Sequence, residues 1–144
     1  MKIPIKVEFF AGGLRPMIAC SLRSTNPTFF GFINAIIDTG SPTTILGISD
    51  VQKMRLSQVQ MKKFIGEEKE VNLGGAQMKT KILENANIRI GNSINITLPV
   101  QVPVKITKGV SPPTIIGVDF LQKANLCFFF NPNKKESYLE KQEE

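Results

Sequence analysis

Turn-forming residues divide this sequence into short segments, and this limits the folds that it can adopt. Eleven glycines and nine prolines are spread along the 144 residues. Between them lie β-prone runs such as 2–10, 17–22 and 30–37, with alternating or continuous apolar residues that are typical of strands. No segment suggests a second core. The pattern predicts one mostly-β domain with one or two short helices, covering residues 1–132, followed by a charged C-terminal tail, 133–144.

Further elements follow from the same patterns. Two glycines, Gly74 and Gly75, separate polar strand-like runs and predict a hairpin. Helical patterning first appears at 49–64, where Ser49 is a suitable N-cap. The composition of 23–29 predicts a loop. We expect strands at 43–46, 86–90, 94–106, 114–116 and 126–130, and a short helix at 118–124. Pro99 and Pro103 predict that the strand at 94–106 is irregular or lies at an edge.

Charge and composition exclude several partners. The net charge is +6, but the basic residues are scattered, which favours a soluble basic surface over nucleic-acid binding. No apolar run is long enough for a signal peptide or a membrane span. The two cysteines, Cys20 and Cys127, do not form a disulfide framework. We therefore expect a cytoplasmic protein with no nucleic-acid or membrane partner.

The absence of histidine restricts the chemistry further. It removes Ser-His-Asp and Cys-His triads and nearly all catalytic zinc sites. The sequence also lacks the glycine-rich loops that hold phosphates, so we expect no metal and no cofactor. Carboxylates are then the remaining catalytic candidates, and the chain has only three aspartates, Asp38, Asp50 and Asp119.

Asp38 directly follows three apolar residues and precedes Thr-Gly-Ser-Pro. It can be a turn cap, which is the usual role of Asp before Thr-Gly. It can be a metal ligand, although no further carboxylate lies nearby in the sequence. It can also be half of a carboxylate pair that shares one proton and activates water. The third role needs a second copy of the chain to supply the other acid.

The run Cys127-Phe128-Phe129-Phe130 presents a separate packing question. Side chains alternate along a strand, so these aromatic rings cannot all lie on one face. Either a second subunit covers the additional face, or one ring packs against a neighbouring loop.

Residues 35–47, AIIDTGSPTTILG, resemble the active-site loop of retroviral-type aspartic proteases, the retropepsins. Residues 114–121, TIIGVDFL, resemble the second signature of that family, and Gly74-Gly75 stands between the two, where its mobile flap is expected. The resemblance implies a single-lobe, closed β-barrel-like fold that works as a homodimer. It also implies an aspartic endopeptidase that cleaves extended polypeptide. A non-cleaving peptide-binding module on the same fold is the alternative.

The resemblance implies a role for each matching residue. Asp38 is the catalytic carboxylate, Thr39 bonds to the partner's loop, Gly40 lets its N–H approach the carboxylate, and the Ser41 hydroxyl bonds to the outer carboxylate oxygen. The residues implied as flap and substrate-binding are Leu73, Gly74, Gly75 and Ala76. Those implied to support the loop from below are Ile115, Ile116 and Gly117. Val118 departs from the arginine usual in viral members, and we expect Asp119 to cap a helix.

Overall fold

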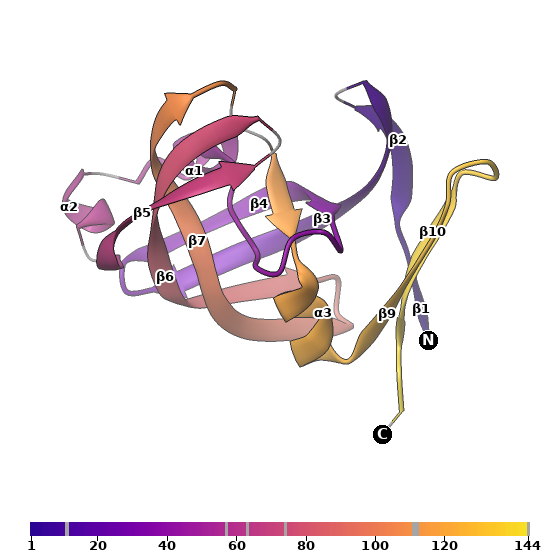
Figure 1. Ribbon diagram of the computed structural model, residues 1–144. Coiled ribbons are helices and arrows are strands. Elements are labelled where there is room, and N and C mark those ends of the chain that lie inside the picture. The colour runs from indigo at the N-terminus through magenta and orange to yellow at the C-terminus, as the bar shows by residue number, and fades with distance from the viewer. Residues whose placement is uncertain (11, 57, 63, 74, 111–112, 144) are drawn as a thin grey trace.

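The computed structural model describes residues 1–10, 12–56, 58–62, 64–73, 75–110 and 113–143. The fold is mostly β, as predicted, with short helices at its edges (Figure 1). In chain order the elements are β1 (Lys2–Pro4), β2 (Lys6–Phe10), β3 (Gly13–Thr25), β4 (Thr28–Ile37), α1 (Ile48–Lys53), α2 (Gln58–Met61), β5 (Ile65–Leu73), β6 (Ala76–Ile90), β7 (Ile94–Lys108), β8 (Thr114–Ile116), α3 (Val118–Ala124), β9 (Leu126–Asn131) and β10 (Glu136–Lys141).

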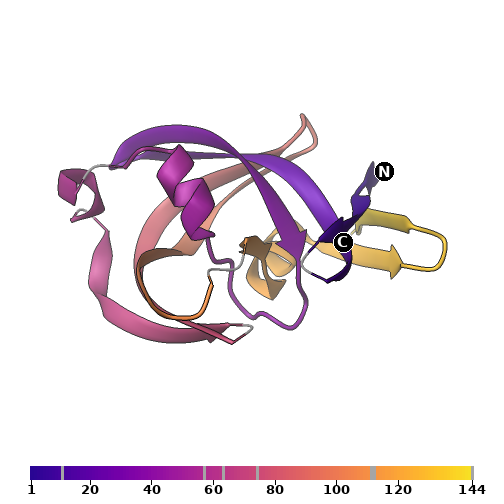
Figure 2. The same ribbon diagram turned by 90° about the horizontal axis from the view of Figure 1, so that it is seen from above.

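A seven-stranded sheet makes up most of the molecule. Its strand order is β5-β6-β3-β4-β8, with β2 also paired to β3 and β7 to β6. The strands curve around a common interior (Figure 2), which holds fully buried side chains such as Leu22, Ile88 and Phe120. All pairs in this sheet are antiparallel except β4–β8, which is parallel. The parallel pair brings the two sequence signatures together.

The expected helix at 49–64 forms as two separate helices. The first, α1, ends at Lys53 with Met54 as its C-cap, because Arg55 adopts a left-handed conformation with φ of 52° that a helix cannot continue through. Gly47, and not Ser49, occupies its N-cap position. Helix α3 has the predicted bounds, and its C-cap, Asn125, is also left-handed. None of the helices that the structure describes has the length and hydrophobicity needed to cross a bilayer.

Three local expectations were wrong. The segment 23–29 is not a loop, because β3 and β4 stay paired as far as Thr25 and Thr28, and the inward-facing Ser24 and Phe29 are buried. The run 2–10 divides at Ile5 into strands that join different sheets. Instead of a strand, 43–46 makes only isolated bridges at Ile45. By contrast β7, which contains both prolines, is irregular as predicted, since its pairing with β6 shifts register.

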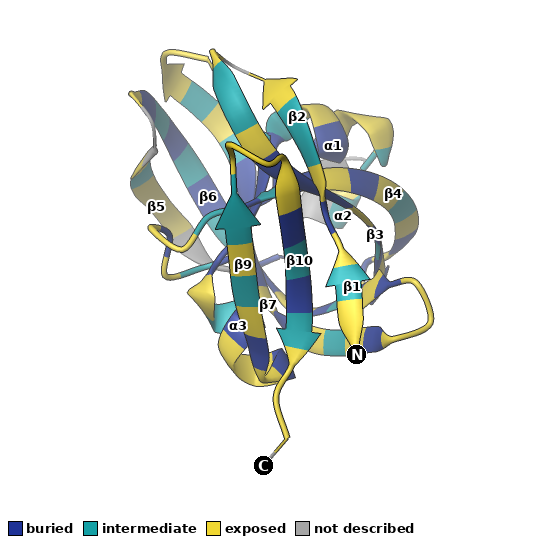
Figure 3. Cartoon of the chain, turned by 90° about the vertical axis from the view of Figure 1, so that its right-hand side faces the viewer, coloured by how far each residue is buried: buried dark blue, intermediate teal, exposed yellow. Residues whose placement is uncertain are grey.

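The expected C-terminal tail is also wrong in its central part. Within 133–144, the strand β10 lies between β1 and β9 in a separate three-stranded sheet (Figure 3). Alternation explains the insertion, because Ser137 and Leu139 point inward and are buried, while polar neighbours face out. On the outer face Phe129 stacks on Tyr138, with ring centroids 4.8 Å apart, and stays 38% exposed. That contact answers part of the packing question raised by the phenylalanine run.

Candidate active site

Asp38 follows the last residue of β4, a strand that pairs with β3 on one side and β8 on the other. Its approach is apolar, because Ala35 and Ile37 are buried in the core. The Asp38 backbone N–H donates to the carbonyl of Ile116 in β8, at 3.0 Å. The buried strand therefore ends at a half-buried carboxylate whose own backbone is fixed.

The loop orients this carboxylate with its own backbone. The Gly40 N–H donates to Asp38 Oδ1 at 2.8 Å, and the Ser41 N–H donates to the Asp38 carbonyl at 3.2 Å. A Cβ on residue 40 would lie 3.1 Å from Asp38 Oδ1, so a side chain there would crowd the acid. The close approach implied at Gly40 is thus present. The adjacent Thr39 is exposed.

The role implied for Ser41 is not what the structure shows. Its hydroxyl donates to the carbonyl of Thr43 at 2.7 Å, and the residue is only 4% exposed. The side chain points into the loop, where it satisfies a backbone acceptor, and a hydroxyl has a single proton to donate. Ser41 therefore stabilises the turn instead of bonding to the outer oxygen of the carboxylate.

The second signature packs against β4 and this loop. Ile115 pairs with Ile36 of β4. The first two N–H groups of α3 donate to the loop: Val118 to the Ser41 carbonyl at 2.9 Å and Asp119 to the Pro42 carbonyl at 3.2 Å. These bonds use helix-terminal donors that have no partner within the helix. The loop that carries Asp38 therefore rests on the start of α3.

Gly117 permits this contact. A Cβ at this position would lie 2.4 Å from the Thr43 carbonyl oxygen and 2.8 Å from that of Ser41. Both distances are well inside van der Waals contact, and both neighbours are backbone atoms that cannot rotate away. The loop and α3 can approach this closely only because residue 117 has no side chain.

Asp119 does more than the expected capping. Its carboxylate accepts from the Phe120 N–H at 2.8 Å, within the first turn of α3. It also accepts from the Thr44 N–H at 3.1 Å and the Thr44 hydroxyl at 2.7 Å. The same hydroxyl accepts from the Gly117 N–H at 3.1 Å. Asp119 thus joins the end of the loop that carries Asp38 to the helix beneath it.

Gln101 was not identified from the sequence. Its backbone pairs with the end of the loop, since Gln101 N–H donates to the Thr44 carbonyl and Leu46 N–H donates to the Gln101 carbonyl. Its side-chain amide donates to Thr43 Oγ1 at 2.9 Å and accepts from the Thr80 hydroxyl at 3.0 Å. The contact spans 58 residues, and nothing local in the sequence signals it.

Asp50, the third aspartate, is 4% exposed. Its Oδ2 accepts from the Thr114 hydroxyl at 2.6 Å, and its Oδ1 lies 3.6 Å from Lys53 Nζ. Thr114 Oγ1 in turn accepts from the Gly47 N–H at 2.9 Å. Asp50 therefore connects α1 to β8. Among the described residues, no three side chains of His, Cys, Asp or Glu gather as a metal site would require.

The predicted hairpin is formed by β5 and β6, with Leu73 paired to Ala76. Gly75 has φ of 83°, a conformation that favours glycine, and Gly74 lies outside the described residues. In Figure 2 the hairpin ends of β5 and β6 lie on the same side of the molecule as the loop that follows β4.

No protein-family model and no curated protein matches this sequence. Among solved structures, the chain is similar to a retropepsin-like aspartic protease from Rickettsia conorii, with a TM-score of 0.59 and 18% sequence identity. The match covers 98% of this chain and 91% of that chain. At this identity the similarity concerns the fold and not the activity. The chain therefore has a mostly-β, retropepsin-like fold.

Proposed function

We propose that this protein is an aspartic endopeptidase that acts as a homodimer. The observation that carries the proposal is the geometry of Asp38. Its carboxylate is held at 2.8 Å by the Gly40 N–H, on a loop fastened from below by β8 and α3. An aspartate that only caps a turn does not require β8 and α3 to hold its loop in place.

The second carboxylate comes from a second copy of the chain. Asp50 and Asp119 are engaged in the bonds to Thr114 and Thr44 described above, so neither is available to Asp38. A two-fold axis beside the loop brings the partner's Asp38 to the first. Thr39, exposed next to the acid, is then placed to bond to the partner's loop.

The terminal strands provide the contact surface in this proposal. The three-stranded sheet of β1, β10 and β9 leaves the Phe129–Tyr138 stack partly exposed on its outer face. A second copy seated on this sheet removes the ring of Phe129 from water, which favours association.

The chemistry follows from two carboxyl groups that share one proton. The ionised group accepts a proton from water, whose oxygen attacks the carbonyl carbon of the scissile peptide bond, while the protonated group hydrogen-bonds to the carbonyl oxygen. The tetrahedral intermediate collapses when the amide nitrogen takes a proton and leaves as the amine. The two groups exchange roles between these steps, and no cofactor takes part.

Substrate binds as an extended strand between the loop and the β5–β6 hairpin. The hairpin acts as the flap, with Leu73, Gly75 and Ala76 at its described tip. Closure of the flap excludes water and places backbone hydrogen-bonding groups along the peptide.

Digestion of an unfolded protein across about pH 3 to 8 tests the proposal. We expect Asp38→Asn to lower the cleavage rate by roughly 10³-fold or more, the scale of loss when one member of a catalytic unit is removed. Glu84→Gln, at an exposed carboxylate on β6, is the matched control and should cleave like the wild type. If the wild type binds a labelled peptide but cleaves nothing at any pH, the peptide-binding alternative is correct.

Mixed dimers test whether both chains contribute an acid. Wild-type and Asp38→Asn chains with different tags are co-expressed, and dimers that carry both tags are isolated. We expect these dimers to be almost inactive, because each has a single carboxylate at the axis. Half of the wild-type activity would show that each chain works alone, and would exclude the shared site.

A further inference from the structure

One face of the large sheet carries exposed aromatic and basic side chains that are far apart in the sequence. Strands β4, β3 and β6 lie side by side there. In the register of these strands, Phe32 lies opposite Ser21, and Ser21 opposite Arg89. Two residues further along this pair of strands, on the same face, Phe30 lies opposite Arg23. These residues therefore form one continuous surface across three strands.

The two phenylalanines are exposed although they are large and apolar. Phe32 is 75% exposed and Phe30 48%, and their ring centroids lie 5.1 Å apart with the rings nearly perpendicular. The guanidinium of Arg23 lies 5.4 Å from the Phe30 ring centroid. Isolated exposed apolar side chains are common, but an adjacent pair braced by a cation indicates a surface that is used for binding.

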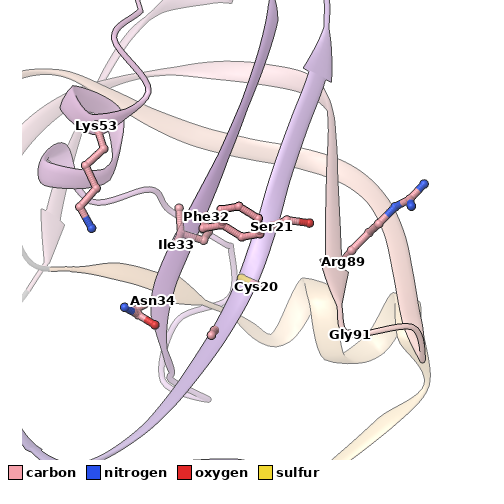
Figure 4. Close-up of a pocket in the computed structure, with 9 residues that line it drawn as sticks. Cys20, Ser21, Phe32, Ile33, Asn34, Lys53, Arg89 and Gly91 are labelled. Atoms are coloured by element: carbon pink, nitrogen blue, oxygen red, sulfur yellow. The ribbon is translucent and has the colours of Figure 1, made fainter.

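A shallow hollow of about 490 Å³ adjoins Phe32. Figure 4 shows Phe32 and Ser21 between Lys53 of α1 and Arg89 of β6. Lys53 pairs with the buried Asp50 at 3.6 Å, yet its side chain is 63% exposed. The described residues that line the hollow include no carboxylate, so its accessible charge is positive.

We propose that this face binds single-stranded nucleic acid. Unpaired bases stack on Phe32 and Phe30, and phosphates contact Arg23, Arg89 and Lys53. A sheet that combines exposed aromatic rings with cations suits this ligand, because every base offers a ring face and every linkage a negative charge. A duplex fits poorly, since its ring faces are already stacked inside the helix. The net charge of +6 favours the same ligand.

This proposal revises the expectation drawn from the sequence. The basic residues looked scattered because positions 23, 53 and 89 share no local motif. Strand pairing brings Arg23 and Arg89 to one surface, and Lys53 of α1 lines the hollow beside it. The proposal does not depend on catalysis by Asp38, because no residue of this face belongs to the active-site loop, to β8 or to α3.

Fluorescence anisotropy with labelled oligouridine RNA and oligothymidine DNA of about 15 nucleotides tests the proposal directly. We expect both to bind, and more tightly than a duplex of the same length. Phe32→Ala should weaken binding about tenfold or more, the effect of losing one stacked base. Arg89→Gln should weaken binding and reduce the slope of log affinity against log salt by about 0.7.

Matched variants away from this face serve as controls. Phe9→Ala removes an aromatic ring that is 75% exposed, like Phe32, and Lys134→Gln removes an exposed charge from the β9–β10 turn. Both should bind like the wild type. Chemical denaturation of each variant establishes that it is folded, so that a loss of binding reports on the surface.

Several results would overturn the proposal. These are no change in anisotropy at low salt up to about 100 µM protein, equal affinity for duplex and single strand, or equal losses in Phe32→Ala and Phe9→Ala. Phe32-dependent binding to anionic phosphatidylglycerol vesicles, with no binding of oligonucleotides, would assign the face to a membrane surface instead.

Discussion

At the scale of single residues, backbone atoms of the loop leave no space for a side chain at Gly117. Replacing it by alanine places a methyl group 2.4 Å from the Thr43 carbonyl oxygen, so either the loop or α3 must move. We expect Gly117→Ala to lower the free energy of unfolding by at least about 2 kcal/mol, the scale of overpacking in a dense core. Urea denaturation measures this.

Gly13→Ala is the matched control for that substitution. Its Cβ would meet no atom within 4 Å, and its φ lies outside the left-handed region. The stability of this variant should stay within about 0.5 kcal/mol of wild type. Equal effects of the two substitutions would contradict the packing described beneath the active-site loop.

Cys20 provides a prediction about pH. Burial, and then the charge of Asp50, raises the pKa of this thiol to about 12 from an ordinary value of 9.0. The unfolded chain releases the proton in that interval while the native state keeps it. The contribution of the protonated Cys20 thiol to the free energy of unfolding is therefore fully present below about pH 9, and it is lost as the pH rises toward 12.

Thiol labelling tests whether Cys20 is buried and protonated in the folded protein. At about pH 8, iodoacetamide should modify both thiols in urea but should leave Cys20 unmodified in the native protein, because the thiolate is the reactive form. A Cys127→Ser variant should then stay unlabelled until it unfolds. Rapid labelling of that folded variant would show that Cys20 is neither buried nor fully protonated.

Residue roles were predictable where a contact is local. Gly40 bonds to an acid two residues away, and the spacing within Asp-Thr-Gly already implies that geometry. The hydroxyl of Ser41 has competing acceptors nearby, and it donates its hydrogen bond to the backbone carbonyl of Thr43. Gln101 meets the loop only through the folding of β7 against it, so no local pattern could reveal the contact.

At the scale of elements, β10 is the strand whose role most differs from expectation. Leu139 is fully buried at the centre of the three-stranded sheet, so we expect Leu139→Ala to lower the free energy of unfolding by about 2–5 kcal/mol. Urea denaturation measures this at one fixed protein concentration, since the proposed dimer would also contribute to stability.

Val59→Ala is the control, because Val59 is 70% exposed on α2. Its effect should remain within about 0.5 kcal/mol. If Leu139→Ala were as mild, the last strand would have no structural role and the segment would be the tail that its composition suggested.

Elements were predictable where turn residues limit them on both sides. Gly117 separates β8 from α3, and Asn125 ends α3 in a left-handed conformation, so these bounds can be read from the residues. The segment 49–64 has helical periodicity without such limits, and the left-handed Arg55 divides it. The polar composition of two segments concealed β10 and the paired ends of β3 and β4. Burial in a sheet depends on which partner covers each face, and composition does not reveal the partner.

At the scale of the whole molecule, the chain holds half of the proposed catalytic site. One copy presents one Asp38, and its other two aspartates have structural partners. The proposed dimer and the proposed nucleic-acid surface use different faces, so either can fail in experiment without the other. A protein that has both would bring proteolysis to single-stranded nucleic acid.

The sequence by itself determined the fold class, the position of the acid, the absence of histidine chemistry and the two signatures, because these depend on residue type and short spacing. The tertiary structure alone decided what supports the acid, where the last strand lies and which charges share a surface. Those features depend on strand pairing between residues far apart in the chain, and pairing of that kind is set by burial of the whole core.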